Sequence, residues 1–162
     1  MEKNVVKNIL ADTDLRQNLI KLKGSMTSTD TLEGPIVEKL CDCLTHEDPK
    51  VRKNAALLLG YTKNPLMASV LLDAYKNEKK DFVKDAYLKG MSRYDCKRYI
   101  KELQEIQNEL MNSEVVDSKH IKAQLKVLNP MIRSYSYHKK KSIRLLHKEV
   151  DVILTTLPYY QY

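Results

Sequence analysis

The chain has 162 residues, of which 43% are hydrophobic and 30% are charged, and its formal net charge is +7. This length suits one domain with a substantial core, and the four glycines and five prolines are too few for a long disordered tail. No apolar run approaches the roughly 18 residues of a membrane span, and residues 1–6 lack a signal-peptide stretch, so we expect a cytoplasmic protein without a membrane contact.

Two short helices are predicted at the start of the chain. Apolar side chains on one face predict the first over Val5, Val6, Ile9 and Leu10. A cap at Asp12 or Thr13 would open the second, whose apolar residues recur every three or four positions at Leu15, Leu19, Leu22 and Met26. Residues 25–30 are rich in serine, threonine and aspartate, which indicates a loop before a helix that begins at Gly34 and Pro35.

Residues 48–60 carry the strongest local pattern in the chain. Asp48 fits the helix-capping position, and Pro49 fits the first helical position, where its missing N–H has no cost. We expect Gly60 to end the helix in a left-handed conformation. Two adjacent alanines keep the helix thin, so a neighbour can pack closely against it. The buried face is predicted to consist of Val51, Ala55, Leu58 and Leu59.

The pattern Asp-Pro-x-Val-Arg-x-x-Ala-Ala-x-x-Leu-Gly in residues 48–60 resembles the HEAT-repeat family. The resemblance implies an all-α fold, a right-handed α-solenoid of HEAT-like helical hairpins, which mostly serves as a binding scaffold. A second, degenerate copy of the pattern begins at Asp81, and Val83 repeats Val51 after 32 residues. The helix between the two copies is expected to start at Asn64-Pro65.

Two more helices are predicted after the second copy. The first carries an apolar stripe made of Tyr99, Leu103, Ile106 and Leu110. A short acidic linker over residues 113–117 precedes the second, which has a heptad-like stripe of Ile121, Leu125, Leu128, Ile132 and Tyr135. Pro130 lies inside this pattern and should kink or split the helix near Asn129.

The end of the chain changes character. Residues 138–148 are a predicted basic linker, and residues 149–158 are rich in β-branched side chains and predict a strand. One strand cannot form a sheet, so the extended tail over residues 149–162 either packs irregularly on the helices or is the first strand of an absent domain. We favour the absent domain, with residues 1–137 as the HEAT-like helical domain.

The excess positive charge is concentrated in one segment. Residues 1–117 hold 19 basic and 19 acidic residues, whereas residues 118–148 hold nine basic residues and no acidic one. Such a segment attracts phosphates, and tyrosines precede its lysine run, so we predict an RNA contact. The predicted nucleic-acid-binding residues are Lys139, Lys140, Lys141, Arg144, Tyr135 and Tyr137. Two alternatives are a solvated linker, with Tyr135 in the core, and a contact with an acidic protein or an anionic membrane surface.

The alternative function is a protein–protein interaction scaffold with no nucleic-acid role. In a HEAT solenoid the second helix of each pair lines a concave face, whose predicted contact residues here are Lys50, Arg52, Lys53 and Lys84, with Lys80 and Asp85 beside them. Arg52 has a structural alternative as a ladder residue bonded to a neighbouring carbonyl or acid. Salt dependence separates the two functions, because only phosphate binding weakens steeply with salt.

On a larger scale, the chain resembles the N-terminal HEAT-type domain of clostridial-type RNA methylase-like proteins. In those proteins the helical domain precedes a module similar to THUMP and Rossmann-type methylases. Residues 48–60, 81–89 and 151–158 carry this resemblance. It implies an accessory domain that binds tRNA or rRNA for a methyltransferase domain.

Catalytic motifs are missing from the sequence. The four glycines never cluster, and no Asn/Asp-Pro-Pro-aromatic motif is present, so we expect no enzyme activity, cofactor or small-molecule substrate. Asp81 and Asp85 lie one turn apart, but adjacent lysines favour a solvated charged face. The histidines are interpreted as surface residues without a role: His46, His120, His138 and His147. Cys41, Cys43 and Cys96 are interpreted as free thiols without a metal.

Overall fold

The structure is a computed structural model that describes residues 3–113 and 118–135. The helices are α1 (Lys3–Leu10), α2 (Leu15–Ser25), α3 (Pro35–Asp42), α4 (Pro49–Leu59), α5 (Met67–Asn77), α6 (Asp81–Met91) and α7 (Ile100–Met111), with short 3-10 turns η1 (Cys43–Thr45) and η2 (Lys97–Tyr99). A further helix covers residues 119–135. Within the described ranges there is no strand, only an isolated bridge between Leu32 and Thr62.

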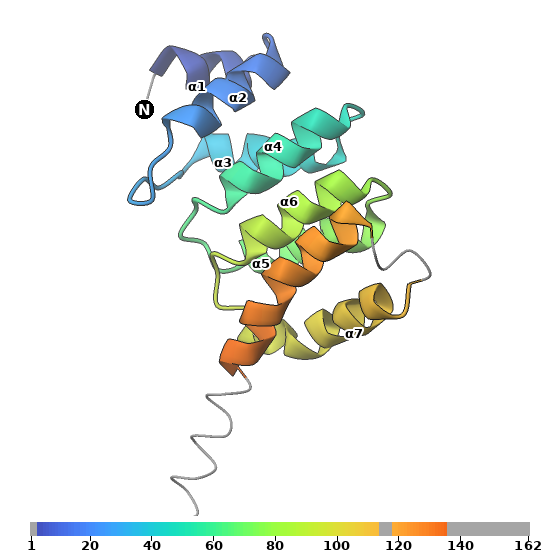
Figure 1. Ribbon diagram of the computed structural model, residues 1–162. Coiled ribbons are helices and arrows are strands. Elements are labelled where there is room, and N and C mark those ends of the chain that lie inside the picture. Colours follow the sequence, from blue (N-terminus) through green and yellow to red (C-terminus); the bar gives the residue numbers. More distant parts are fainter. Residues whose placement is uncertain (1–2, 114–117, 136–162) are drawn as a thin grey trace, which may run out of the picture.

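The helices form pairs that stack in chain order from the N-terminal end (Figure 1). In the first three pairs α1 packs on α2, α3 on α4, and α5 on α6. The second helices of these pairs also pack on one another, α2 on α4 and α4 on α6, and the contact of α4 with α6 is the more extensive of the two. This arrangement confirms the predicted all-helical repeat fold, while the right-handed sense of the solenoid stays a prediction.

The predicted start of α4 is confirmed. The Asp48 carboxylate accepts a hydrogen bond from the Lys50 amide at 2.7 Å, and Pro49 occupies the first turn. The four residues predicted for the buried face, Val51, Ala55, Leu58 and Leu59, are all buried. The second copy begins at Asp81, 32 residues after Pro49, as the repeat predicts.

The role predicted for Gly60 is wrong. Its φ of −61° and ψ of −12° are right-handed helical values, so it is not a left-handed terminator. A Cβ on Gly60 would lie 2.8 Å from Cδ of Arg93 and 3.2 Å from Cα of Gly90. Residue 60 is therefore a glycine because the end of α6 approaches α4 too closely for a side chain.

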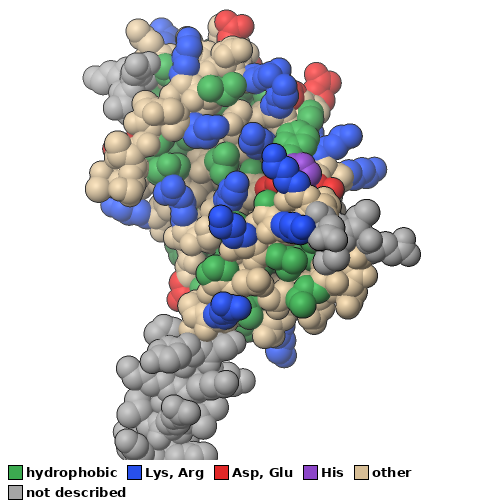
Figure 2. Space-filling view, viewed as in Figure 1, with side chains coloured by type: hydrophobic (Ala, Val, Ile, Leu, Met, Phe, Trp, Pro, Cys, Tyr) green, Lys and Arg blue, Asp and Glu red, His purple; other side chains and the backbone are tan. Residues whose placement is uncertain are grey.

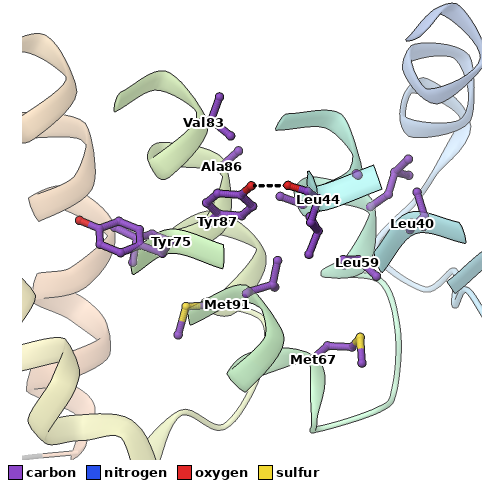
Figure 3. Close-up of a cluster of buried hydrophobic side chains, with 14 of the residues drawn as sticks. Leu40, Leu44, Leu59, Met67, Tyr75, Val83, Ala86, Tyr87 and Met91 are labelled. Carbon is purple, nitrogen blue, oxygen red and sulfur yellow. Dashed lines mark hydrogen bonds between the residues drawn. The ribbon is translucent and has the colours of Figure 1, made fainter. Parts of the chain in front are cut away.

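The core runs continuously through the helix pairs. Tyr87 stands where the first copy has Ala55, and its side chain is 1% exposed. Its hydroxyl donates to the Leu44 carbonyl at 3.4 Å, across the seam between the second and third pairs. Figure 3 shows this ring among apolar side chains from both pairs, including Leu40, Leu59, Met67, Val83, Ala86 and Met91.

Two local expectations need correction. The residue that caps α2 is Asp14, with a left-handed φ of 41°, and not Asp12 or Thr13. Its carbonyl accepts the Asn18 amide at 3.0 Å, which starts the helix without a side-chain cap. Pro130 does not split the last helix, which is continuous from residue 119 to 135. The proline is exposed, so the carbonyl that loses its helical partner can be hydrated.

The predicted linker over residues 138–148 and the tail over residues 149–162 lie outside the described residues. In the described part, no helix combines the length and the apolar character needed to cross a membrane.

Candidate functional site

Charge is divided unequally between the first and second helices of the pairs. We call α2, α4, α6 and the helix over residues 119–135 the basic row. It carries the basic residues Arg16, Lys21, Lys23, Lys50, Arg52, Lys53, Lys84, Lys89, Lys119, Lys122, Lys126 and Arg133, and its acidic residues are Asp81 and Asp85. The other helices carry the acids Glu38, Asp42, Asp73, Glu102, Glu105 and Glu109 and the bases Lys3, Lys7, Lys39, Lys76 and Lys101.

The balanced charge of residues 1–117 is therefore segregated in space. Figure 2 shows Lys and Arg side chains spread over the face formed by the basic row, with few Asp or Glu side chains among them. The helix over residues 119–135 joins this row beside α6, because Nδ1 of His120 lies 2.8 Å from Oδ2 of Asp85. A partner that lay along this face would meet mostly positive charge.

A hollow of about 450 Å³ lies among α2, α4 and α6. Its walls hold four basic side chains, two apolar ones and one amide: Arg16, Ile20, Lys23, Lys50, Lys53, Asn54 and Phe82. We call it the basic hollow. No acidic residue lines it, and the ion pairs found among the described residues do not involve its four basic side chains.

Asn54 fixes one of the ammonium groups of the hollow. Its side chain is 4% exposed, its Oδ1 accepts from Nζ of Lys23 at 3.0 Å, and its Nδ2 donates to the Lys50 carbonyl at 2.9 Å. Burial, and then the nearby charge of Lys53, lower the pKa of Lys23. The protonated form of Lys23 would therefore be stabilised by an anion in the hollow.

Apolar surface adjoins these cations. Ile20 lies on α2, a helix of the basic row, and is 40% exposed. Phe82, in the first turn of α6, is partly exposed and lines the same hollow. The hollow therefore offers both charge and apolar contact, which a plain solvated lysine face lacks.

The four residues predicted for the concave face do not share one environment. Lys50 and Lys53 belong to the basic hollow, and Nζ of Lys84 lies 5.2 Å from the ring centroid of Tyr75. Arg52 is engaged elsewhere: its Nε and Nη2 donate to Glu78 at 2.7 and 2.9 Å. Its Nη1 donates to the carbonyls of His46 and Glu47. Arg52 thus has the ladder role that was its structural alternative, while the binding roles of the three lysines stay predictions.

The predicted RNA-binding residues fall mostly outside the described part of the chain. Tyr137, Lys139, Lys140, Lys141 and Arg144 lie beyond residue 135. The hydroxyl of Tyr135 accepts a hydrogen bond from the Cys96 amide at 2.7 Å, and its ring is partly buried. This contact ties the last helix to the turn before α7, as the alternative with Tyr135 in the core would require.

His120 lies at the surface as predicted, with its side chain 40% exposed, but it makes a tertiary contact that was not predicted. Its ring pairs with Asp85, whose side chain is only 13% exposed and whose Oδ1 is buried without a hydrogen-bond partner. No local pattern could signal this pair, because 35 residues separate its members. Asp85 therefore takes part in a tertiary contact instead of a solvated charged face.

The three cysteines are free thiols, as predicted. Burial raises the pKa of Cys43 and of Cys96 to about 11, so both are protonated near neutral pH. Among the described residues, no group of three or more His, Cys, Asp or Glu side chains is placed to hold a metal ion.

Comparison with known protein families matches residues 4–92 to HEAT repeats. The chain belongs to the HEAT-repeat family. No curated protein and no solved structure matches it. HEAT membership indicates a binding or scaffold module of a typically non-catalytic kind. The match ends with the third helix pair, so the HEAT repeats contain the whole of the basic hollow.

Sequence reasoning missed five residues of the hollow: Arg16, Ile20, Lys23, Asn54 and Phe82. One signal was available, because residues 15–25 and 49–59 contain six basic residues and no acid. This local excess of basic residues was not noticed because basic and acidic residues are equal in number over residues 1–117 as a whole.

Proposed function

We propose that this HEAT-repeat chain is a non-catalytic module that binds RNA along the basic row. The observation that carries the proposal is the basic hollow, where four cationic side chains from two helices converge with no acid among the lining residues. Phosphates of a polynucleotide would replace the missing counter-charges, and the release of condensed ions would drive binding. The further cations of α6 and of residues 119–135 extend the same charge beyond the hollow.

A second part of the proposal concerns the basic residues of the segment 136–148. We propose Lys139, Lys140, Lys141 and Arg144, which come after residue 135 in the sequence, as further phosphate contacts. On the resemblance described above, the RNA would be the tRNA or rRNA substrate of an RNA methylase-like protein. The competing function is a protein scaffold, which HEAT membership supports directly and which would hold an acidic partner on the same face.

The test is the binding of a mixed tRNA pool across a salt series. The variant Lys23→Gln/Lys50→Gln/Lys53→Gln removes three charges from the hollow. Its matched control, Lys7→Gln/Lys76→Gln/Lys101→Gln, removes three charges from exposed positions on α1, α5 and α7. We expect the hollow variant to lose about tenfold in affinity at low salt, and its log–log salt slope to fall by roughly 2.

The control should change both quantities much less. Equal losses in the two variants would mean unspecific attraction to net charge and would contradict a site in the hollow. Absence of binding by the natural sequence at low salt would contradict RNA binding and leave the protein scaffold as the better account. The variant Lys139→Ala/Lys140→Ala/Lys141→Ala/Arg144→Ala measures the share of the segment beyond residue 135.

A further inference from the structure

We infer that the basic hollow takes an unpaired base of a single-stranded RNA, with the ring of Phe82 as the stacking surface. This inference rests on the proposed function and narrows the ligand from a polyanion to a strand with exposed bases. It assigns different tasks to the two kinds of side chain in the hollow. The cations contact the phosphates, and the apolar side chains contact the base.

Phe82 is only partly buried against the core, at a repeat position where the first copy has no apolar side chain. The 32-residue period aligns it with Lys50, which is exposed on α4. The following residue, Val83, aligns with Val51, and both are buried. Phe82 is also the single phenylalanine of the chain. The first copy has a solvated lysine at this position. Part of the Phe82 ring therefore lies in the hollow, where it is available to a ligand.

The composition of the hollow matches the chemistry of a single strand. Proteins that bind single strands combine a positively charged groove with aromatic side chains on which bases stack. Ile20 adds apolar surface on the α2 side, and Lys23, held by Asn54, adds a positioned ammonium group. A duplex would meet only the cations, because its bases are already paired and stacked. An acidic peptide without aromatic residues would likewise leave Phe82 without a planar partner.

The size of the hollow supports the same ligand. About 450 Å³ lies within the range of about 300–1,000 Å³ typical of small-molecule sites. A single nucleotide therefore suits the hollow. The rest of the strand would continue over the lysines of the basic row.

The experiment compares three probes on the full chain: a single-stranded RNA of twelve nucleotides, the same RNA as a duplex, and inorganic polyphosphate of similar charge. We expect Phe82→Leu to lose about tenfold in affinity for the single strand and to leave polyphosphate binding unchanged. Phe82→Tyr should bind the single strand within about threefold of the natural sequence, because it keeps a stacking ring.

A second variant gives a direct optical signal. The chain contains no tryptophan, so the indole of Phe82→Trp would be its single tryptophan. Stacking on a base should quench its fluorescence on saturation with the single strand, and polyphosphate should not. Thermal unfolding of each variant establishes that it is folded.

The outcomes separate this inference from the proposed function. Unchanged single-strand affinity in Phe82→Leu, or an unquenched indole at saturation, would overturn base stacking, and polyphosphate binding would still support a polyanion site. If neither RNA nor polyphosphate binds the natural sequence, the proposed function fails. Tighter binding of the duplex than of the single strand would also overturn the inference.

Discussion

At the scale of single residues, Arg52 and Glu78 close the seam between the second and third helix pairs. The Glu78 carboxylate accepts from two guanidinium nitrogens and from the amides of Lys79 and Lys80. Burial alone would raise the pKa of Glu78, but these hydrogen bonds outweigh it and lower the pKa below its ordinary value of 4.5. The Glu78 side chain is 4% exposed, so the pair is a structural element and a poor ligand for a partner.

Glu78→Gln should destabilise the fold and change its acid response. It leaves the Arg52 guanidinium without its carboxylate, and we expect a loss of about 2 to 3 kcal/mol in the free energy of unfolding at pH 7, because Arg52 keeps some access to water. The contribution of Glu78 is full above its unfolded-state pKa and is lost as the pH falls through its lower folded-state pKa.

Urea unfolding between pH 7 and pH 3 measures both effects. Below about pH 4.5 the stabilities of the natural sequence and of Glu78→Gln should converge. The control Glu47→Gln removes the same charge from an exposed side chain in the neighbouring turn. A constant difference between Glu78→Gln and the natural sequence at every pH would contradict the assigned ionisation.

At the scale of elements, the crossing of α4 and α6 depends on the absence of side chains. A Cβ on Gly90 would lie 2.5 Å from the carbonyl oxygen of Ala56 and 3.0 Å from Cδ1 of Leu71. The carbonyl belongs to the helix backbone and cannot move independently. The contact of α4 with α6 is the most extensive among helices α1 to α7, and both helices also contribute residues to the basic hollow.

Gly90→Ala should therefore destabilise the chain in spite of the better helix propensity of alanine. We expect a loss of about 1 to 3 kcal/mol, because the two helices must move apart. Gly24→Ala is the matched control: residue 24 lies in α2, and a Cβ there meets nothing within 4 Å. It should stabilise the chain by about 0.5 to 1 kcal/mol. Thermal unfolding of both variants provides the comparison, and similar effects would contradict the close approach.

At the scale of the whole molecule, stability depends on contacts between successive helix pairs, as in other repeat proteins. The last helix buries Leu128, Met131 and Ile132 in the core, and single polar contacts also join it to α5, α6, α7 and the turn before α7. Gln124 accepts from Tyr75 at 2.7 Å, His120 pairs with Asp85, Asn129 accepts from Gln107 at 2.6 Å, and Tyr135 accepts from Cys96 at 2.7 Å. Each of these polar contacts can be removed by a single substitution.

Tyr135→Phe should loosen this end without unfolding the repeats. It leaves the Cys96 amide without its partner, which costs about 1 to 2 kcal/mol. Amide hydrogen exchange should show lower protection over residues 97–111 and 119–135, with α4 unchanged. Tyr61→Phe removes a hydroxyl that makes no hydrogen bond in the described part of the chain and should leave exchange unaltered. Uniform loss of protection in Tyr135→Phe would contradict local coupling.

The sequence alone determined the features that depend on neighbouring residues. The cap at Asp48 and the apolar face of α4 follow from helical spacing within about four residues, and the 32-residue period follows from a second copy of the same local pattern, so all three could be read directly. The left-handed end predicted at Gly60 was wrong, and the pair of His120 with Asp85 was not predicted, because both features depend on contacts with α6 or with residues 119–135. The tertiary structure alone decided which helices lie side by side. That arrangement placed Lys23 beside Asn54, Phe82 across from Ile20, and the acids of residues 1–117 mostly away from the basic row. These features could not be read from the sequence because charge and close packing act between residues that are near in space. The stacking of helix pairs brings together residues about 30 positions apart.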